Sequence, residues 1–273
     1  MKYLKKEAKE YAFEHMKGIW AAALTPFNDD LSINEEGMRF NFRHWIDDLK
    51  IQGLFIAGKQ GEFFSMSVDE RKRCFEIAVS EAGYKCQTIM SCSDQNFDTV
   101  LELSKYAEDI GADYIVVHAP ILNFVNDRKQ ILINYYTELS SKVNIGIAMW
   151  SHPDSGYLME PELCNEIAKL ENIVAIKYSV PREMYKKLSE LASDKMIVST
   201  ASEKEWYDNI VELNWKLYLC SSPPFLLQTR NDQRMNKYTE YALEKNFSQA
   251  KLVRDSLDPV RRAFSNSKPP GKP

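Results

Sequence analysis

The stretch IVAIKYS, residues 173–179, places a lysine inside what reads as a buried strand. Four apolar residues lead directly into Lys177, and lysine is almost never fully buried unless it is paired or chemically employed. Alternate residues of a strand share a face, so we expect Ala175, Lys177 and Ser179 to point the same way. If that face lines the inside of a barrel, the ammonium group projects into a confined space.

Seven further apolar runs accompany this one, and they begin at Ile19, Gly53, Thr88, Tyr114, Ile145, Met196 and Leu217. Near-continuous apolar runs are typical of parallel strands that are covered on both faces. Helical patterns lie between them, and the pattern starting at Ser67 has Glu70 three residues later, which predicts a capping box. Eight strand–helix units in 273 residues predict an α/β protein with a (β/α)8 TIM barrel. A doubly wound sheet is the alternative.

The rest of the chain divides around this barrel. We expect an N-terminal helical extension over residues 1–17, the barrel over 18–228 and further helices over 229–264. The remaining segment, 265–273, is rich in proline and glycine, and this composition predicts disorder.

Composition excludes several classes of function. The formal net charge is -4, so there is no basic excess to follow a phosphate backbone, and we expect no nucleic-acid partner. No apolar run approaches the ~20 residues of a membrane-spanning helix, and the N-terminus lacks the apolar core of a signal peptide. These features predict a soluble, cytoplasmic protein without a membrane partner. The five cysteines show no CxxC spacing, which favours free thiols and no metal site.

Lys177 ends its strand, and active sites of (β/α)8 barrels lie at the C-terminal ends of the strands. Burial lowers the pKa of a lysine, and the neutral amine attacks carbonyl carbons to form a Schiff base. The protonated Schiff base is an electron sink that permits cleavage of a neighbouring C–C or C–N bond. The competing interpretation is a lysine that reaches from the strand end into solvent.

A turn with the sequence GKQGE, residues 58–62, follows the second apolar run. Glycines at such a turn allow backbone N–H groups to converge on an anion, and the lysine adds a positive charge. We therefore expect a carboxylate of a 2-oxo acid to be held by Gly58, Lys59, Gln60, Gly61 and Glu62.

These features together resemble the dihydrodipicolinate synthase/N-acetylneuraminate lyase family. The resemblance rests on ALTPF at the end of the first strand, the GxxGE turn, an aromatic residue and a Pro-containing segment after the fifth strand, and IKxS on the sixth, and it spans about residues 18–264. It implies a class I Schiff-base lyase or aldolase that acts on pyruvate or another 2-oxo acid. It implies no cofactor beyond the lysine imine, and a homo-oligomer, either a dimer or a tetramer. It also implies that Lys177 forms the imine, that loop 58–62 holds the carboxylate, and that Ser179 is the small hydroxyl residue that several members keep.

The sequence departs from the family pattern at several positions. Lys59 and Gln60 replace two hydroxyl residues of the family loop, and Trp150 replaces the catalytic tyrosine that normally ends the fifth strand. An indole N–H donates a hydrogen bond but does not shuttle protons at neutral pH. Ile121 and Leu122 stand where the synthases carry two tyrosines, and no arginine matches the one that binds their second carboxylate. These departures argue against a dihydrodipicolinate synthase. The segment STASEKEW, residues 199–206, likewise argues against a standard sialic acid lyase.

Other residues are candidates for the missing proton transfer. His152 lies two positions beyond Trp150, and histidine titrates near neutral pH, so we predict that His152 or a bound water moves protons. A loop histidine that only bonds backbone is the alternative. His118, at the end of the fourth strand, is a second candidate that reads more readily as a packed histidine.

Serines and aromatic residues complete the predicted site. Serines at strand ends are expected to hold substrate hydroxyls or a water, and these are Ser199, Ser221 and Ser222. An apolar wall is expected from Trp150, Phe63, Phe64 and Phe124.

Three functional hypotheses follow. The first is a Schiff-base lyase that performs aldol cleavage, aldol addition or hydratase–aldolase chemistry on a 2-oxo acid, with Lys177 as nucleophile. The second is dehydration or C–N cleavage through the same imine, suggested by the GEFFS sequence at residues 61–65. The third is a non-catalytic barrel that binds a 2-oxo acid; the missing tyrosine favours it and the retained lysine opposes it.

Overall fold

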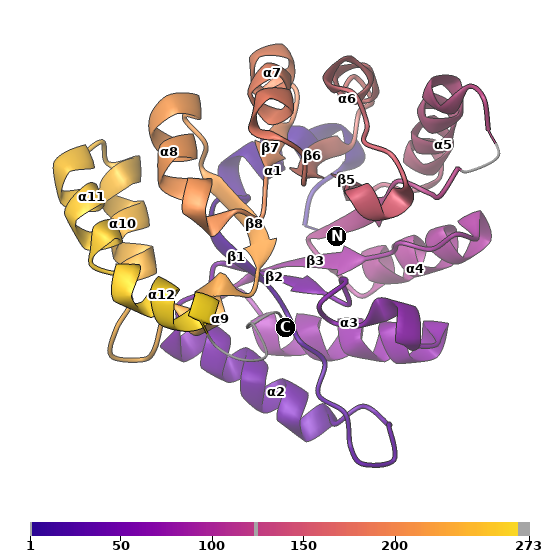
Figure 1. The fold of residues 1–273 in the computed structure, drawn as a ribbon. Helices are drawn as coiled ribbons and strands as arrows, with labels where there is room; N and C mark the ends of the chain where they lie inside the picture. The colour runs from indigo at the N-terminus through magenta and orange to yellow at the C-terminus, as the bar shows by residue number, and fades with distance from the viewer. Residues whose placement is uncertain (1, 123–124, 267–273) are drawn as a thin grey trace.

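The computed structural model describes residues 2–122 and 125–266. In this part of the chain, parallel strands surrounded by helices form a (β/α)8 barrel, as predicted (Figure 1). The strands are β1 (Gly18–Ala22), β2 (Gly53–Ile56), β3 (Gln87–Ser91), β4 (Tyr114–His118), β5 (Gly146–Ser151), β6 (Ile173–Tyr178), β7 (Ile197–Ser199) and β8 (Leu217–Ser221).

Helices follow the strands and cover the outer face of the barrel (Figure 1). They are α2 (Glu35–Arg43), which continues into the π-helical turn η2 (His44–Asp48), α3 (Val68–Ala82), α4 (Phe97–Asp109), α5 (Arg128–Lys142), α6 (Pro161–Ile167), α7 (Arg182–Ala192) and α8 (Glu203–Leu213). The capping box predicted for α3 is present: Ser67 Oγ accepts from the N–H of Glu70 at 3.2 Å, and the Glu70 carboxylate accepts from the N–H of Ser67 at 2.8 Å.

Strand pairing follows the chain order β7-β6-β5-β4-β3-β2-β1-β8 and leaves one seam between β7 and β8. A side chain bridges that seam. Ser199 Oγ donates to the carbonyl of Leu217 at 2.7 Å and accepts from the N–H of Leu219 at 3.0 Å. Ser199 is fully buried there, so its hydroxyl takes the place of a backbone rung where the barrel closes.

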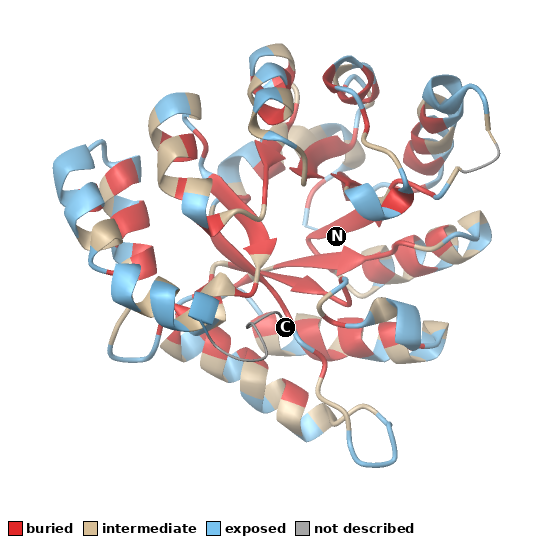
Figure 2. Cartoon of the chain, viewed as in Figure 1, coloured by how far each residue is buried: buried red, intermediate tan, exposed pale blue. Residues whose placement is uncertain are grey.

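The barrel interior is a second hydrophobic core, separate from the layer between strands and helices. The strands between these two cores are buried along most of their length (Figure 2). The N-terminal residues, with η1 (Lys5–Glu7) and α1 (Ala8–His15), supply part of it. Tyr3 donates its hydroxyl to the carbonyl of Asp113 at 2.5 Å and accepts from the N–H of Gly146 at 2.8 Å. Because Asp113 precedes β4 and Gly146 starts β5, this segment plugs the N-terminal end of the barrel.

More helices follow β8. They are the short α9 (Pro223–Leu226), then α10 (Arg234–Leu243), α11 (Phe247–Asp255) and α12 (Asp258–Asn266). The prediction of disorder from residue 265 onward is wrong for Ser265 and Asn266, which continue α12. Residues 267–273 lie outside the described part of the chain.

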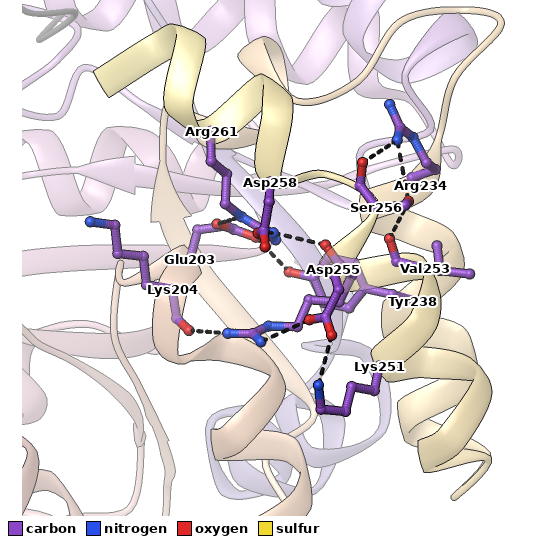
Figure 3. A network of polar contacts seen from close by, with 11 residues as sticks. Glu203, Lys204, Arg234, Tyr238, Lys251, Val253, Asp255, Ser256, Asp258 and Arg261 are labelled. Atoms are coloured by element: carbon purple, nitrogen blue, oxygen red, sulfur yellow. Dashed lines mark hydrogen bonds and ion pairs between the residues drawn. The ribbon is translucent and has the colours of Figure 1, made fainter. Parts of the chain in front are cut away.

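A buried carboxylate ties α12 to the barrel (Figure 3). Glu203, at the start of α8, accepts two hydrogen bonds from Arg261 of α12, at 2.7 and 3.0 Å, and one from the Tyr238 hydroxyl of α10 at 2.9 Å. The Glu203 and Arg261 side chains are only 6% and 15% exposed, so the pair is largely shielded from water.

No helix among the described residues is long and apolar enough to cross a membrane. All five cysteines are buried and free of disulfide bonds.

Candidate active site

One row of side chains crosses four neighbouring strands at their C-terminal ends. The strand register pairs His118 with Trp150, Trp150 with Lys177, and Lys177 with Ser199. Laterally paired residues of a parallel sheet point to the same face. Because Trp150 belongs to the barrel-interior cluster, the row faces inward.

The Lys177 amine lies between two aromatic rings. Its Nζ is 4.7 Å from the ring centre of Trp150 and 4.8 Å from that of Phe55, and the residue is 7% exposed. Within the described chain, Lys177 forms neither an ion pair nor a hydrogen bond.

Burial lowers the pKa of Lys177; the charge of Lys59 lowers it further and Cys220 opposes the shift. Two cation–π contacts stabilise the charged form by only about 1–2 kcal/mol each, whereas burial of an unpaired ammonium costs several kcal/mol. Desolvation therefore dominates, and it favours the neutral, nucleophilic amine.

A cavity of about 520 Å³ opens beside this amine. Most of the residues predicted for the site line it: Lys59, Gln60, Glu62, Trp150, His152, Lys177, Ser179 and Ser221. The cavity walls also include Phe64, which was predicted, and Ala22, Phe55, Ala201 and Cys220, which were not.

The loop 58–62 is held tightly against β1 and β2. A side chain on Gly61 would place Cβ 2.9 Å from the carbonyl oxygen of Ala23, and one on Gly58 would lie 2.9 Å from the Phe55 ring. The Thr25 hydroxyl donates to the Gly61 carbonyl at 2.8 Å. Glycine is thus required at both positions, because the neighbouring atoms leave no room for a side chain. The left-handed conformations of this segment fall on its flanks, at Ala57 and Glu62, with φ of 49° and 59°.

Three amides of this loop have no acceptor in the described protein. The N–H groups of Lys59, Gln60 and Gly61 donate to no acceptor among residues 2–122 and 125–266. Successive free N–H groups form a concavity that binds anions. The loop therefore has the donors that a carboxylate requires.

Lys59 already has an anionic partner across the mouth of the cavity. Its Nζ forms an ion pair with Asp154, and the two side chains are 51% and 49% exposed. Asp154 follows β5 in the 3-10 turn η4 (Pro153–Ser155). A substrate carboxylate would have to share Lys59 with Asp154, and the sequence did not reveal this competition.

His152 has one ring nitrogen committed to its own loop. Nδ1 accepts from the N–H of Asp154 at 3.2 Å and lies 3.2 Å from its carboxylate. Burial lowers the pKa of His152, the Asp154 carboxylate opposes this, and Lys59 and Lys177 add to it. The backbone contact favours a proton on Nε2 of a neutral His152, whereas the carboxylate contact favours one on Nδ1.

His118 has a single acceptor that fixes its tautomer. Its Nδ1 lies 2.8 Å from the carbonyl oxygen of Ala119, which only accepts, so Nδ1 carries the proton and Nε2 keeps a free lone pair. The ring meets Trp150 edge-on at 4.9 Å and is half-buried. Burial lowers the pKa of His118, which favours this neutral form.

A model of the dihydrodipicolinate synthetase family matches residues 15–265 of the chain. The chain belongs to this family. The family predicted from the GxxGE turn and the IKxS strand is therefore confirmed, and a lyase of the class I aldolase type agrees with it.

Curated relatives include N-acetylneuraminate lyases. The one from Clostridium perfringens is 33% identical over 190 residues, and the one from Fusobacterium nucleatum is 33% identical over 165 residues. These matches cover 69% and 60% of this chain, but only 65% and 56% of the relatives. The chain thus spans less than two thirds of the length of these relatives.

Solved structures of the family share the fold. The Fusobacterium nucleatum N-acetylneuraminate lyase superposes with a TM-score of 0.81 at 25% identity, covering 92% of this chain and 84% of that one. Clostridium difficile CdNal in complex with mannosamine gives 0.79 at 26% identity, covering 89% and 82%. A dihydrodipicolinate synthase at 23% identity gives 0.80 over 92% and 84%, which shows the fold alone.

Some sequence-based assignments require correction. Ser199 was expected to contact substrate, but its hydroxyl is engaged by Leu217 and Leu219 at the barrel seam. Ser222 is buried at the start of α9, whereas Ser221 does line the cavity. Phe124 lies outside the described residues.

Five residues of the site were not anticipated, namely Ala22, Phe55, Ala201, Cys220 and Asp154. Phe55 sits in the apolar run GLFI and Cys220 in LYLCS, so both read as ordinary core. Asp154 lies in the segment SHPDSGY, residues 151–157, where a single exposed carboxylate reads as an ordinary loop residue. The described residues hold no group of His, Cys, Asp or Glu that could bind a metal ion.

Proposed function

We propose that this chain is a lyase of the class I aldolase type, which forms an imine between Lys177 and pyruvate or a related 2-oxo acid. The observation that carries the proposal is the Lys177 amine, which is unpaired, lies between Phe55 and Trp150, and faces a cavity at the C-terminal end of the barrel. A lysine kept only for solubility would reach solvent, as half-exposed Lys59 does.

The chemistry begins with attack of the neutral amine on the keto carbon. Loss of water gives a protonated imine, which accepts the electron pair of a bond to the neighbouring carbon. The carboxylate of the acid is held by the free amides of loop 58–62, with Lys59 as the nearby cation. These steps use side chains and backbone alone and require no cofactor.

The groups that transfer protons differ from those of a dihydrodipicolinate synthase in this proposal. Trp150 occupies the place of the family tyrosine, and its buried Nε1–H has no hydrogen-bond partner among the described residues. Proton transfer therefore falls to other groups beside Trp150, and the two histidines are within ring contact of it, at 4.9 and 6.1 Å. We also propose that the chain assembles as a homo-oligomer, as its resemblance to the family implies.

Borohydride trapping tests this proposal. The protein is incubated with pyruvate and a panel of other 2-oxo acids, reduced, and weighed as the intact chain. We expect a mass gain with at least one acid, and none in Lys177→Ala. Lys72→Ala, which removes a lysine of α3 that is paired with Glu102 of α4, serves as the matched control and should trap as the wild type does. No adduct with any acid would overturn the proposal and favour a non-catalytic barrel.

A further inference from the structure

A second cavity adjoins the first. It has a volume of about 380 Å³ and shares Lys59, Phe64 and Trp150 with the Lys177 cavity. His118 lines the second cavity, and His118 and Lys177 both lie within ring contact of Trp150, at 4.9 and 4.7 Å. The two cavities are therefore neighbouring parts of one site.

Apolar surface dominates this second cavity. Phe63, Phe64, Pro120, Ile121 and Trp150 contribute to its wall. Phe64 is 67% exposed and Ile121 is 48% exposed, although large apolar side chains are more stable when covered. A ligand with an apolar face would cover both.

The charges around this cavity are already neutralised. Lys59 is paired with Asp154. Asp94 accepts from the N–H of Asn96 at 2.9 Å and lies 3.4 Å from the Arg71 guanidinium. Because the proposed function also uses Lys59 for the carboxylate of the 2-oxo acid, a second anionic group would find no further cation there.

The neutral polar groups also have partners, although the hydroxyl proton of Ser93 is donated to no acceptor among the described residues. The Gln95 amide bonds both the N–H and the carbonyl of Ile121, at 3.0 and 2.9 Å. Ser93 Oγ accepts from the N–H of His118 at 2.9 Å and from Ser91 at 3.3 Å. In the described chain, Nε2 of His118 is the side-chain acceptor of this cavity that has no partner.

We propose that this second cavity binds the aldehyde half of the aldol, that this half is uncharged and largely apolar, as an aromatic aldehyde is, and that His118 Nε2 exchanges the proton of its oxygen. The proposal rests on the imine-forming function above. A polyhydroxy aldehyde needs several hydrogen-bond partners, and one free nitrogen among aromatic and aliphatic groups would leave most of its hydroxyls unpaired.

His118 is the one base that the cleavage reaction requires, because it accepts one proton and later returns it. Nε2 of His118 takes the proton of the hydroxyl on the carbon to be released, and that C–O bond becomes the aldehyde carbonyl. The C–C bond breaks, and its electron pair moves into the protonated imine to give an enamine. The protonated His118 then returns its proton to the enamine carbon, and water hydrolyses the imine to release the 2-oxo acid and free Lys177.

The test compares aldehydes in the presence of pyruvate. Benzaldehyde represents the apolar class, glyceraldehyde the polyhydroxy class and succinic semialdehyde the anionic class, and each aldol product is measured by chromatography. We expect kcat/KM for benzaldehyde to exceed the values for glyceraldehyde and succinic semialdehyde by at least about tenfold. This is the loss expected when one hydroxyl or carboxylate of the aldehyde has no hydrogen-bond partner in the cavity.

The His118→Asn variant tests the proton transfer. We expect kcat for benzaldehyde addition to fall about 100-fold, a typical loss for one general acid–base group, while the borohydride-trapped pyruvate adduct forms as in the wild type. The part of the acid-side fall in rate that reports protonation of His118, near His152, Asp154 and Lys59, should disappear, while the part that reports protonation of Lys177 should remain. His44→Asn, on η2 and paired with Asp48, is the control and should behave as the wild type.

The outcomes separate the two proposals. No adduct in the wild type overturns the imine function, and this inference with it. An adduct combined with preference for glyceraldehyde or succinic semialdehyde, or with no aldol product at all, overturns this inference alone. A His118→Asn variant that retains kcat and the acid limb, or that loses the pyruvate adduct, shows that His118 is not the proton carrier.

Discussion

Lys177 and Trp150 are paired in register across β6 and β5, and the lysine Nζ lies 4.7 Å from the centre of the indole ring. Trp150, which departs from the family pattern, therefore lies directly beside Lys177, which matches it. Trp150 has lost the proton-carrying hydroxyl of a tyrosine, but it supplies an apolar wall that desolvates the amine. The departure removes a proton-carrying group from the site and leaves Lys177, the proposed nucleophile, in place.

Lys177 should make stability depend on pH. Its folded-state pKa lies below the unfolded value of 10.5, because of burial first and Lys59 second. Between these two values the unfolded chain binds more protons, so the free energy of unfolding of the wild type rises with pH in that window. Lys177→Met lacks this titration and removes a buried unpaired charge.

We therefore expect Lys177→Met to be more stable than the wild type at about pH 6, by about 1.4 kcal/mol for each unit by which the pKa is lowered. The margin should shrink as the pH approaches 10.5. Urea unfolding at several pH values measures it. A margin that stays constant with pH would show that the lysine is not desolvated.

Lys59→Ala should weaken binding of the 2-oxo acid with little effect on the fold. Its ion pair with Asp154 is half-exposed, and such pairs stabilise a protein by at most about 1 kcal/mol. We expect the acid concentration that gives half-maximal trapped adduct to rise about tenfold, because one charged contact to the carboxylate is lost. Lys85→Ala, which removes an exposed ion pair with Asp47, is the control. Equal half-maximal concentrations in the two variants would exclude Lys59 from the carboxylate site.

Ser199→Ala should destabilise the protein without weakening substrate binding. The substitution leaves the carbonyl of Leu217 and the N–H of Leu219 without the hydroxyl that bridges β7 and β8. Each buried polar group left unpaired costs about 1–3 kcal/mol. Urea unfolding should show a loss in this range, whereas the exposed Ser141→Ala should be neutral. A Ser199→Ala variant that binds the acid more weakly at unchanged stability would instead support the role predicted from sequence.

Arg261→Met should loosen the attachment of α12. The change leaves Glu203 buried with Tyr238 as its remaining partner (Figure 3). Removal of one member of a buried ion pair costs about 3 kcal/mol. Thermal unfolding should detect this loss, and the neighbouring exposed Arg262→Met supplies the control. Equal melting temperatures of the two variants would show that the pair adds nothing to stability.

The fold followed from sequence because its signals are local. Each strand appears as a short apolar run, and the capping box of Ser67 and Glu70 marks the start of α3. Lys177 was found for the same reason, since one charged residue interrupts an apolar run. Family membership rested on motifs in the chain itself, and the match over residues 15–265 confirms it.

The contacts that define the site could not be read in the same way, because they join residues far apart in the chain. Lys59 meets Asp154 across 95 positions, and Ser199 reaches Leu217 only because the barrel closes there. The roles of the two histidines depend on which ring nitrogen is already bonded, and that is set by the backbone around Ala119 and Asp154. A strand-end serine or a loop histidine looks the same in sequence whichever of these partners it has.

The central claim is that the Lys177 amine is the nucleophile, and locating the trapped adduct tests it most directly. The protein is reduced with borohydride in the presence of pyruvate, digested, and mapped by mass spectrometry. We predict one adduct per chain, on the peptide that contains Lys177, with Lys59 and the surface lysines unmodified. An adduct on Lys59 or spread over surface lysines, with Lys177 unmodified, would contradict the account.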